Sequence, residues 1–337
     1  MKKALGTLLP LCIIGFVGFW ISAAVLGTKD ISSNNLGSES QFDNTAEKSW
    51  STDYSVKNAE YTAKIAANDN LTLDISDVSA TIVPWDGDDI EIYVKNTSNR
   101  AVNVSLNRDN GKNTKIDIDT SFFGWFHFNI FDWDNSKRFV EIKMPKKTFE
   151  KAKIDMGSGS ASISGIYARD YDIDMGSGSL EFNDALLKSN SFRLDMGSGK
   201  SVFNNIITDN YKINIGSGSC TISEISGTGD IDMGSGSLNI TFMDSPAGKF
   251  DMGSGHAVMN INDSADTTFK FSIGSGSVDF NACGKTEKVT NHNCDDIILG
   301  NGENTFKIDV GSGNVEVKSA GSQKFASSSM AEQIQSH

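Results

Sequence analysis

Histidine, cysteine and proline are scarce in this sequence of 337 residues, with four of each. No HExxH, GxSxG, GxGxxG or Walker pattern occurs, so the motifs of zinc proteases, serine hydrolases and nucleotide-binding proteins are missing. Basic residues are outnumbered by acidic ones, 30 against 43, which gives a net charge of −13. This balance argues against nucleic acid as a partner, because there is no basic footprint to displace counterions.

Helix signals are also absent. No segment shows an apolar period of 3.6 residues, no capping box occurs, and 32 glycines interrupt the chain. This composition suits neither a helical bundle nor a disordered chain. The sequence therefore favours an all-β fold.

One long apolar run stands at the amino terminus, from about Ala4 to Gly27, directly after Lys2 and Lys3. It is long enough to cross a hydrocarbon core of about 30 Å as a helix, and the lysines should stay in the cytoplasm. A cleaved signal peptide is the alternative, although the run exceeds the usual length of its apolar region. We expect a single-pass protein of the cell membrane whose carboxyl-terminal part lies outside the cytoplasm.

A repeat built on Gly-Ser-Gly fills the second half of the chain. Its copies begin at Gly157, Gly176, Gly197, Gly216, Gly234, Gly253, Gly274 and Gly311. The first seven lie 18 to 21 residues apart, and the last interval holds an interrupted copy, "ILGNGENTF". A fixed period near 19 residues indicates a repeat architecture.

Each copy of the repeat reads as two strands that flank a corner. The residues three and one before the first glycine, and six after it, are apolar in every copy. Apolar residues at alternate positions predict strands with one buried face, and the glycines should permit corner angles that a side chain would forbid. We predict a parallel β-solenoid, β-helix-like, of coils of about 19 residues. An antiparallel meander of hairpins is the alternative.

The chain divides into five predicted parts. Residues 1–28 form the transmembrane anchor or signal peptide, and residues 29–53 form a flexible polar linker. Residues 54–150 form an amino-terminal β region with a cap, residues 151–318 the Gly-Ser-Gly solenoid, and residues 319–337 a polar tail.

Three segments carry a resemblance to a known family. They are "LTLDISDVSATIVPWDGDDIEIYVKN" (71–96), "FVEIKMPKKTFEKAKIDMGSGSASIS" (139–164) and "LGNGENTFKIDVGSGNVEV" (299–317). They resemble the putative adhesin family, a β-strand-repeat domain of Gram-positive envelope proteins that include members of Lia-type stress operons. The resemblance implies a non-catalytic solenoid with a structural, adhesive or envelope-stress sensory role, and it transfers no catalytic residues.

Acidic residues recur two positions before the first glycine of the copies. The candidates are Asp155, Asp174, Asp195, Asp232 and Asp251. Stacked carboxylates repel one another, and Ca²⁺ could offset this repulsion. However, calcium-binding β-rolls place Asp after their glycines, so we expect no cofactor and favour hydrogen bonds from the corner serines and amides.

An enzyme is the alternative to a binding protein. Polysaccharide lyases with a β-helix fold use acidic clusters and a basic residue, and Arg169 and Arg193 stand near the acidic column. Catalysis needs one singular arrangement, whereas this column is uniform. We therefore predict a non-enzymatic protein whose partners are the membrane and a cell-wall glycan or envelope protein, with no nucleic acid.

Two cysteines flank a polar loop that interrupts the repeat. Outside the cytoplasm Cys283 and Cys294 are candidates for a disulfide that closes this loop. His292 stands nearby, but two Cys and one His are an incomplete ligand set for a metal. Cys220 falls in an apolar column and should be a buried small side chain.

Aromatic residues are concentrated between residues 122 and 133, in the stretch "FFGWFHFNIFDW". This stretch could cap the solenoid core or bind a membrane or sugar surface. The alternation predicts that Phe126 and Phe128 are buried. The candidate binding residues are Phe123, Trp125, Phe131 and Trp133.

Overall fold

The computed structural model describes residues 50–51, 58–64, 69–96, 101–109, 112–121, 138–183 and 187–320. Every regular element in these ranges is a β-strand. No helix among them is long and apolar enough to cross a membrane. The predicted anchor (1–28) and the aromatic stretch (122–133) lie outside the described residues.

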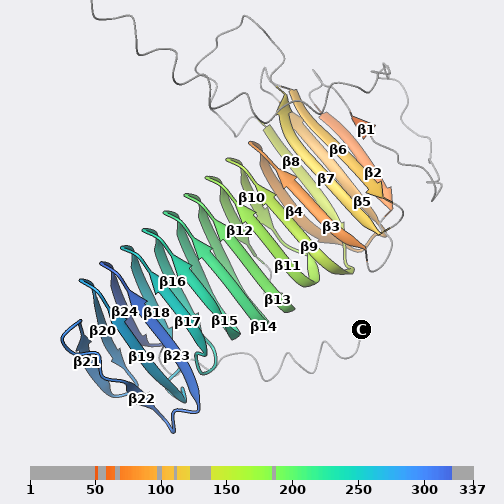
Figure 1. Ribbon diagram of the computed structural model, residues 1–337. Coiled ribbons are helices and arrows are strands. Elements are labelled where there is room, and N and C mark those ends of the chain that lie inside the picture. The colour runs from red at the N-terminus through yellow and green to blue at the C-terminus, as the bar shows by residue number, and fades with distance from the viewer. Residues whose placement is uncertain are drawn as a thin grey trace, which may run out of the picture. The chain divides into compact units, whose positions relative to one another are not determined.

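The strands form two ladders (Figure 1). In stacking order the first ladder contains β1 (Trp50–Ser51), β6 (Ala101–Asp109), β7 (Asn113–Ser121), β3 (Asn70–Ile75), β9 (Thr148–Met156), β11 (Tyr167–Met175), β13 (Leu187–Met196), the second halves of β14 (Lys200–Ile215) and β15 (Ser219–Met233), β17 (Gly248–Met252), β23 (Asn304–Val310), β19 (Thr267–Ile273) and β22 (Ile297–Leu299). The second contains β2 (Asn58–Lys64), β5 (Asp89–Asn96), β8 (Arg138–Pro145), β4 (Ser79–Trp85), β10 (Ser160–Ile163), β12 (Ser179–Phe182), the first halves of β14 and β15, β16 (Ser237–Phe242), β18 (His256–Ile261), β24 (Asn314–Ser319), β20 (Ser277–Ala282) and β21 (Lys285–Val289).

Coils stack in parallel through most of both ladders, which confirms the predicted parallel pairing. Antiparallel strands occur only at the ends of the described ladders, where β6 and β1 follow β7, β5 and β2 follow β8, and β22 and β21 end the opposite side. The parallel coils do not begin at residue 151, because β3–β4 already pairs in register with β9–β10 on one side and with β7–β8 on the other. One repeat geometry therefore extends into the region before the first Gly-Ser-Gly.

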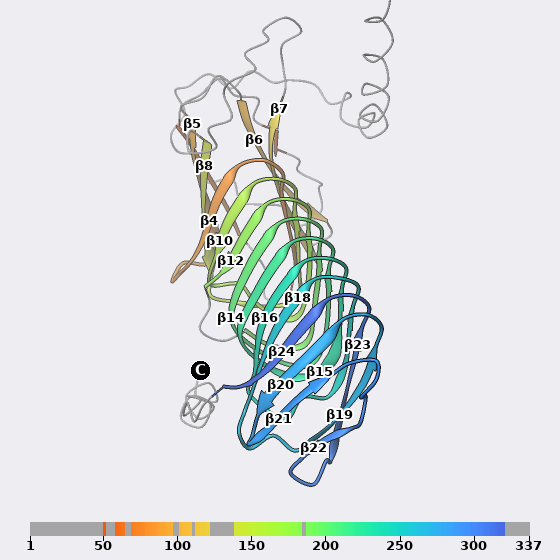
Figure 2. The same cartoon turned by 90° about the vertical axis from the view of Figure 1, so that its left-hand side faces the viewer.

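The core lies between the two ladders, which face each other in Figure 2. Rings from the first ladder contact rings from the second: Tyr171 and Phe182 have centroids 6.1 Å apart, and Phe192 and Phe203 have centroids 5.3 Å apart. The three predicted apolar columns are buried. The exception is Phe271, which is half-buried because its strand β19 lies in the last coil.

The corner glycines serve a different purpose from the one predicted. None of them has a positive φ, so the corner needs no left-handed backbone. A Cβ on Gly178 would instead stand 2.4 Å from the carbonyl oxygen of Gly159 in the neighbouring coil. The prediction of special corner angles is therefore wrong, and close approach of successive coils is the reason for glycine.

Two coils are stacked out of sequence order. The coil β3–β4 lies between β7–β8 and β9–β10, although it precedes both in the chain. The coil β23–β24 lies between β17–β18 and β19–β20, although it follows both, and Figure 2 shows β24 between β18 and β20. The segment "ILGNGENTF" is not an interrupted coil, since it contains the end of the edge strand β22, a turn and the start of β23.

Candidate functional site

A column of acidic side chains runs along the outer side of the first ladder, at the end of each strand. Its members in stacking order are Asp117, Asp74, Asp155, Asp174, Asp195, Asn214, Asp232, Asp251, Asp309 and Ser272. The structure therefore brings all five candidate aspartates into one column. Sequence reasoning missed Asp117 and Asp74 because no Gly-Ser-Gly follows them, although both stand in alternating strands, "KIDI" and "LDIS".

A second column, rich in cations, lies beside the acidic one. Side chains two residues apart in a strand share a face, so the residues two positions before the acidic column are its neighbours. In stacking order they are Lys115, Thr72, Lys153, Asp172, Arg193, Lys212, Asp230, Lys249, Lys307 and Lys270. The two columns together form a band of mixed charge, which we call the charged band.

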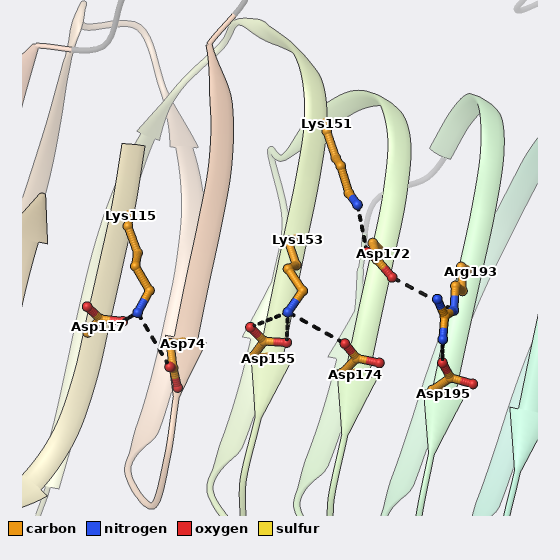
Figure 3. A network of polar contacts seen from close by, with 10 residues as sticks. All are labelled: Asp74, Lys115, Asp117, Lys151, Lys153, Asp155, Asp172, Asp174, Arg193 and Asp195. Atoms are coloured by element: carbon orange, nitrogen blue, oxygen red, sulfur yellow. Dashed lines mark hydrogen bonds and ion pairs between the residues drawn. The ribbon is translucent and has the colours of Figure 1, made fainter. Parts of the chain in front are cut away.

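Cations in the charged band bridge carboxylates of successive coils (Figure 3). The Lys153 ammonium lies 2.8 Å from both carboxylate oxygens of Asp155 and 3.7 Å from Asp174 in the next coil. Arg193 contacts Asp195 and lies 4.0 Å from Asp172 in the preceding coil. These bridges offset the repulsion between stacked carboxylates.

The sequence predicts that the corner serines and amides donate the hydrogen bonds to these aspartates, but side-chain cations donate most of them. Within the described residues, the hydrogen bonds to the acidic column come from Lys, Arg, Asn and Ser105 side chains rather than from the corner serines or amides. The corner amides donate to the neighbouring coil, as in the 2.8 Å bond from Gly176 N to Met156 O. The predicted corner bonds to Asp are therefore wrong, and the corner amides are used in coil stacking instead.

The pKa values of two carboxyl groups in the band are shifted in opposite directions. Burial raises the pKa of Asp174, and the carboxylates of Asp172 and Asp155 raise it further. Burial also acts on Asp195, but hydrogen bonds from Asn214 and Arg193 outweigh it and lower the pKa of that carboxyl. The surroundings therefore disfavour the charged form of Asp174 and favour the charged form of Asp195.

The corner ends of the acidic column line a shallow groove. Its first section, of about 540 Å³, lies over the coils from Asp74 to Asn214. Its second section, of about 820 Å³, continues from Asn214 to Ser272. Asn214 lines both sections, so one open trough follows the acidic column from coil to coil.

Metal ligation finds no support in the described part of the chain. No group of three or more His, Cys, Asp or Glu side chains there is arranged to hold a metal ion. The five aspartates stand one per coil. Lys153 lies between Asp155 and Asp174, and Arg193 and Lys249 contact Asp195 and Asp251.

The two candidate disulfide cysteines are free, and the extended strand β21 lies between them. Cys283 occupies the β20–β21 turn with a φ of 52°, and Cys294 follows the Thr290–Asn293 turn at the other end of β21. An extended strand of five residues separates such ends by roughly 13 Å or more, beyond the reach of a disulfide. The predicted disulfide is therefore not formed in this structure.

Two other predictions about side chains have different outcomes. Cys220 is 1% exposed and pairs with Leu238 in its column, which confirms the predicted buried position. The aromatic candidates Phe123, Trp125, Phe131 and Trp133 lie outside the described residues. Their role as a cap or a binding surface stays a prediction.

Comparison with known proteins gives several solved structures and one family model, and no curated protein gives a significant match. The structure is similar to that of a putative adhesin from Parabacteroides distasonis, with 15% identity and a TM-score of 0.43 over 78% of this chain and 98% of that one. It is also similar to a putative lipid binding protein from Parabacteroides distasonis (17% identity, TM-score 0.35, 78% and 97% covered) and to a putative cell adhesion protein from Clostridium sporogenes (14%, 0.25, 78% and 100%).

A family model matches most of the chain. The Toastrack DUF4097 model aligns with residues 68–318, from just before β3 to near the end of β24. This match agrees with the resemblance to the putative adhesin family that the sequence motifs carry. The chain belongs to the Toastrack DUF4097 family.

Proposed function

We propose that the chain is a non-enzymatic adhesive scaffold that binds an extended cell-wall glycan along the groove beside the charged band. The observation that carries this proposal is periodicity. The acidic column offers one polar side chain per coil at a spacing of about 4.8 Å, over ten coils. This spacing is close to the length of one pyranose unit in an extended glycan.

The chemistry of the band suits a polymer rich in hydroxyl groups. A sugar hydroxyl donates to a carboxylate and accepts from an ammonium or guanidinium group, and both are present in each bridged coil. Asp174 is 44% exposed and Arg193 is 53% exposed in their side chains, so each keeps unused hydrogen-bonding capacity toward solvent. Repetition of weak, similar contacts gives affinity through multivalency rather than through one site.

A binding role fits the band better than catalysis does. Glycoside cleavage requires one singular pair of carboxyl groups placed on either side of a bond. The band instead repeats carboxylates and cations over many coils, with no single pair set apart from the others. We further propose that residues 1–28 anchor the protein in the cell membrane and hold the coils outside the cytoplasm, where a cell-wall polymer is within reach.

The test is cosedimentation of the purified full chain with cell walls from which proteins have been removed. We expect the triple variant Lys153→Gln, Arg193→Gln and Lys249→Gln to bind at least about tenfold more weakly, because one cation is lost in each of three bridges. The matched control is Lys200→Gln, Lys285→Gln and Lys288→Gln, which removes three exposed cations outside the band.

Equal binding by both triple variants would contradict the proposal. So would release of soluble sugar fragments by the wild-type chain, since that result would favour a carbohydrate-active enzyme. Circular dichroism of both variants controls for unfolding.

A further inference from the structure

The coil β23–β24 occupies a slot whose two walls come from earlier parts of the chain. On one side, Asp251 and Met252 of β17 pair with Asp309 and Val310 of β23. On the other side, Ile273 of β19 also pairs with Val310. The second ladder has the same order, β18, β24 and β20. We call this inserted coil, Asn304–Ser319, the terminal coil.

The terminal coil makes full contact with both walls. Its Phe306 ring is fully buried, 5.6 Å from the Phe242 ring and 6.1 Å from the Phe269 ring. At the corner, Gly311 N donates to Met252 O at 2.8 Å, and Val310 O accepts from Gly274 N at 2.7 Å. An empty slot would therefore leave four parallel strand edges unpaired.

The slot's walls are connected to each other without the terminal coil. Residues Asn262–Asp266 join β18 to β19 directly. The terminal coil enters only through the turn after β22, where Gly300 and Gly302 have positive φ values of 60° and 73°. Asp266 holds this turn, because its carbonyl oxygen accepts from Asn304 N at 3.2 Å.

Recognition in the slot depends on ladders that every copy of the chain carries. The band continues across the slot, where Lys249 lies 3.3 Å from Asp309 and Lys307 lies 2.8 Å from the same carboxylate. A terminal coil from a second copy would make these same contacts. The exchange of an identical element between copies is a low-cost route to association.

We propose that this slot exchanges its occupant, so that two copies of the chain associate by each inserting its terminal coil into the other. The turn at Gly300–Gly302 is the hinge. Association is slow, because the coil must first leave its own slot, and it increases with concentration, because the intramolecular coil competes. This association does not depend on glycan binding, although the charged band crosses the slot.

The test uses the full chain with its cysteines except the buried Cys220 replaced by serine and with Asn281→Cys and Lys318→Cys added. Residues 281 and 318 are direct partners across β20 and β24, and both are exposed, so the substitutions leave the core unchanged. Isotopically heavy and light copies are mixed under reducing conditions, incubated at high concentration below the unfolding midpoint, and then oxidised.

We expect disulfide-linked dimers that join a heavy copy to a light one, identified by mass spectrometry of the peptide containing residues 281 and 318. Copies that are oxidised before mixing should form none, because the terminal coil is then fixed in its own slot. Only intramolecular links after prolonged incubation would overturn the proposal. Dimers whose links stay within each copy would also overturn it, since they would place the interface elsewhere.

Hydrogen exchange of the unmodified chain provides a second measurement. If the terminal coil can leave its slot, the hydrogen bonds of the Gly311 and Ser312 amides must break more easily than those of an inner coil. Their hydrogen exchange should therefore be faster than that of Gly197 and Ser198. Equal protection at both corners would overturn the proposal without any variant.

Discussion

Replacing one corner glycine tests whether the distance between coils explains the repeat. A Cβ on Gly178 would stand 2.4 Å from the carbonyl oxygen of Gly159, whereas real contacts of this kind are essentially never under 3.0 Å. The two coils would have to separate by about 0.6 Å at a corner that also carries the hydrogen bond from Ser179 N to Gly159 O at 2.9 Å. Overpacking of this kind costs about 2–3 kcal/mol, so we expect Gly178→Ala to lower the free energy of unfolding by that amount.

The matched control is the other glycine of the same corner. A Cβ on Gly176 would stand 3.0 Å from the Gly157 carbonyl oxygen, which demands only a small adjustment. Alanine also reduces the entropy of the unfolded chain, so Gly176→Ala should stay within about 0.5 kcal/mol of the wild type. Urea unfolding followed by circular dichroism measures both. Equal losses for the two variants, or no loss for Gly178→Ala, would refute the reasoning from coil spacing.

Three further predictions concern the core, the band and the cysteines. Met175 is 4% exposed, so Met175→Asp places an unpaired carboxylate in the core. It should lower the unfolding free energy by more than about 4 kcal/mol in the same assay. At pH 7 Asp174→Asn should be neutral or stabilising by less than about 1 kcal/mol, and this gain should disappear as the pH falls through the raised pKa of Asp174, because the wild-type carboxyl is then also uncharged. Asp195→Asn should lower the unfolding free energy at pH 7, and this loss should shrink as the pH falls through the lowered pKa of Asp195. A change in unfolding free energy of the same sign for both variants would contradict the opposite pKa shifts. Iodoacetamide should label Cys294, which is exposed, and spare Cys220 in the folded chain, since burial raises the pKa of the Cys220 thiol to about 12; mass spectrometry that finds rapid labelling of Cys220 would contradict its buried position.

The sequence predicts the coil but not the order of coils. Alternating apolar residues determine which side chains are buried, as at Ile173 and Met175. Every coil carries the same columns, so any coil can stack on any other. Nothing local to β23 therefore indicates that it pairs with β17 on one side and β19 on the other.

The acidic column could be predicted from the sequence, whereas its counterions were not. Asp recurs at one fixed position, and the neighbouring position holds Lys in several coils but Arg, Asp or Thr in others, so the letters alone do not give which cation contacts which carboxylate. Only the register places Lys153 between Asp155 and Asp174. The disulfide prediction failed for a similar reason, because Cys283 and Cys294 are near in sequence while an extended strand separates them.

The dependence of binding on glycan length tests the central claim most directly. Soluble cell-wall oligosaccharides of increasing length are titrated into the full chain by calorimetry. A groove that repeats its polar groups in each coil predicts that affinity continues to rise as the oligosaccharide spans more coils, and that the Lys153, Arg193 and Lys249 triple variant loses this rise. Affinity that reaches its limit at two or three sugar units, or a length dependence unchanged in the triple variant, would contradict the account.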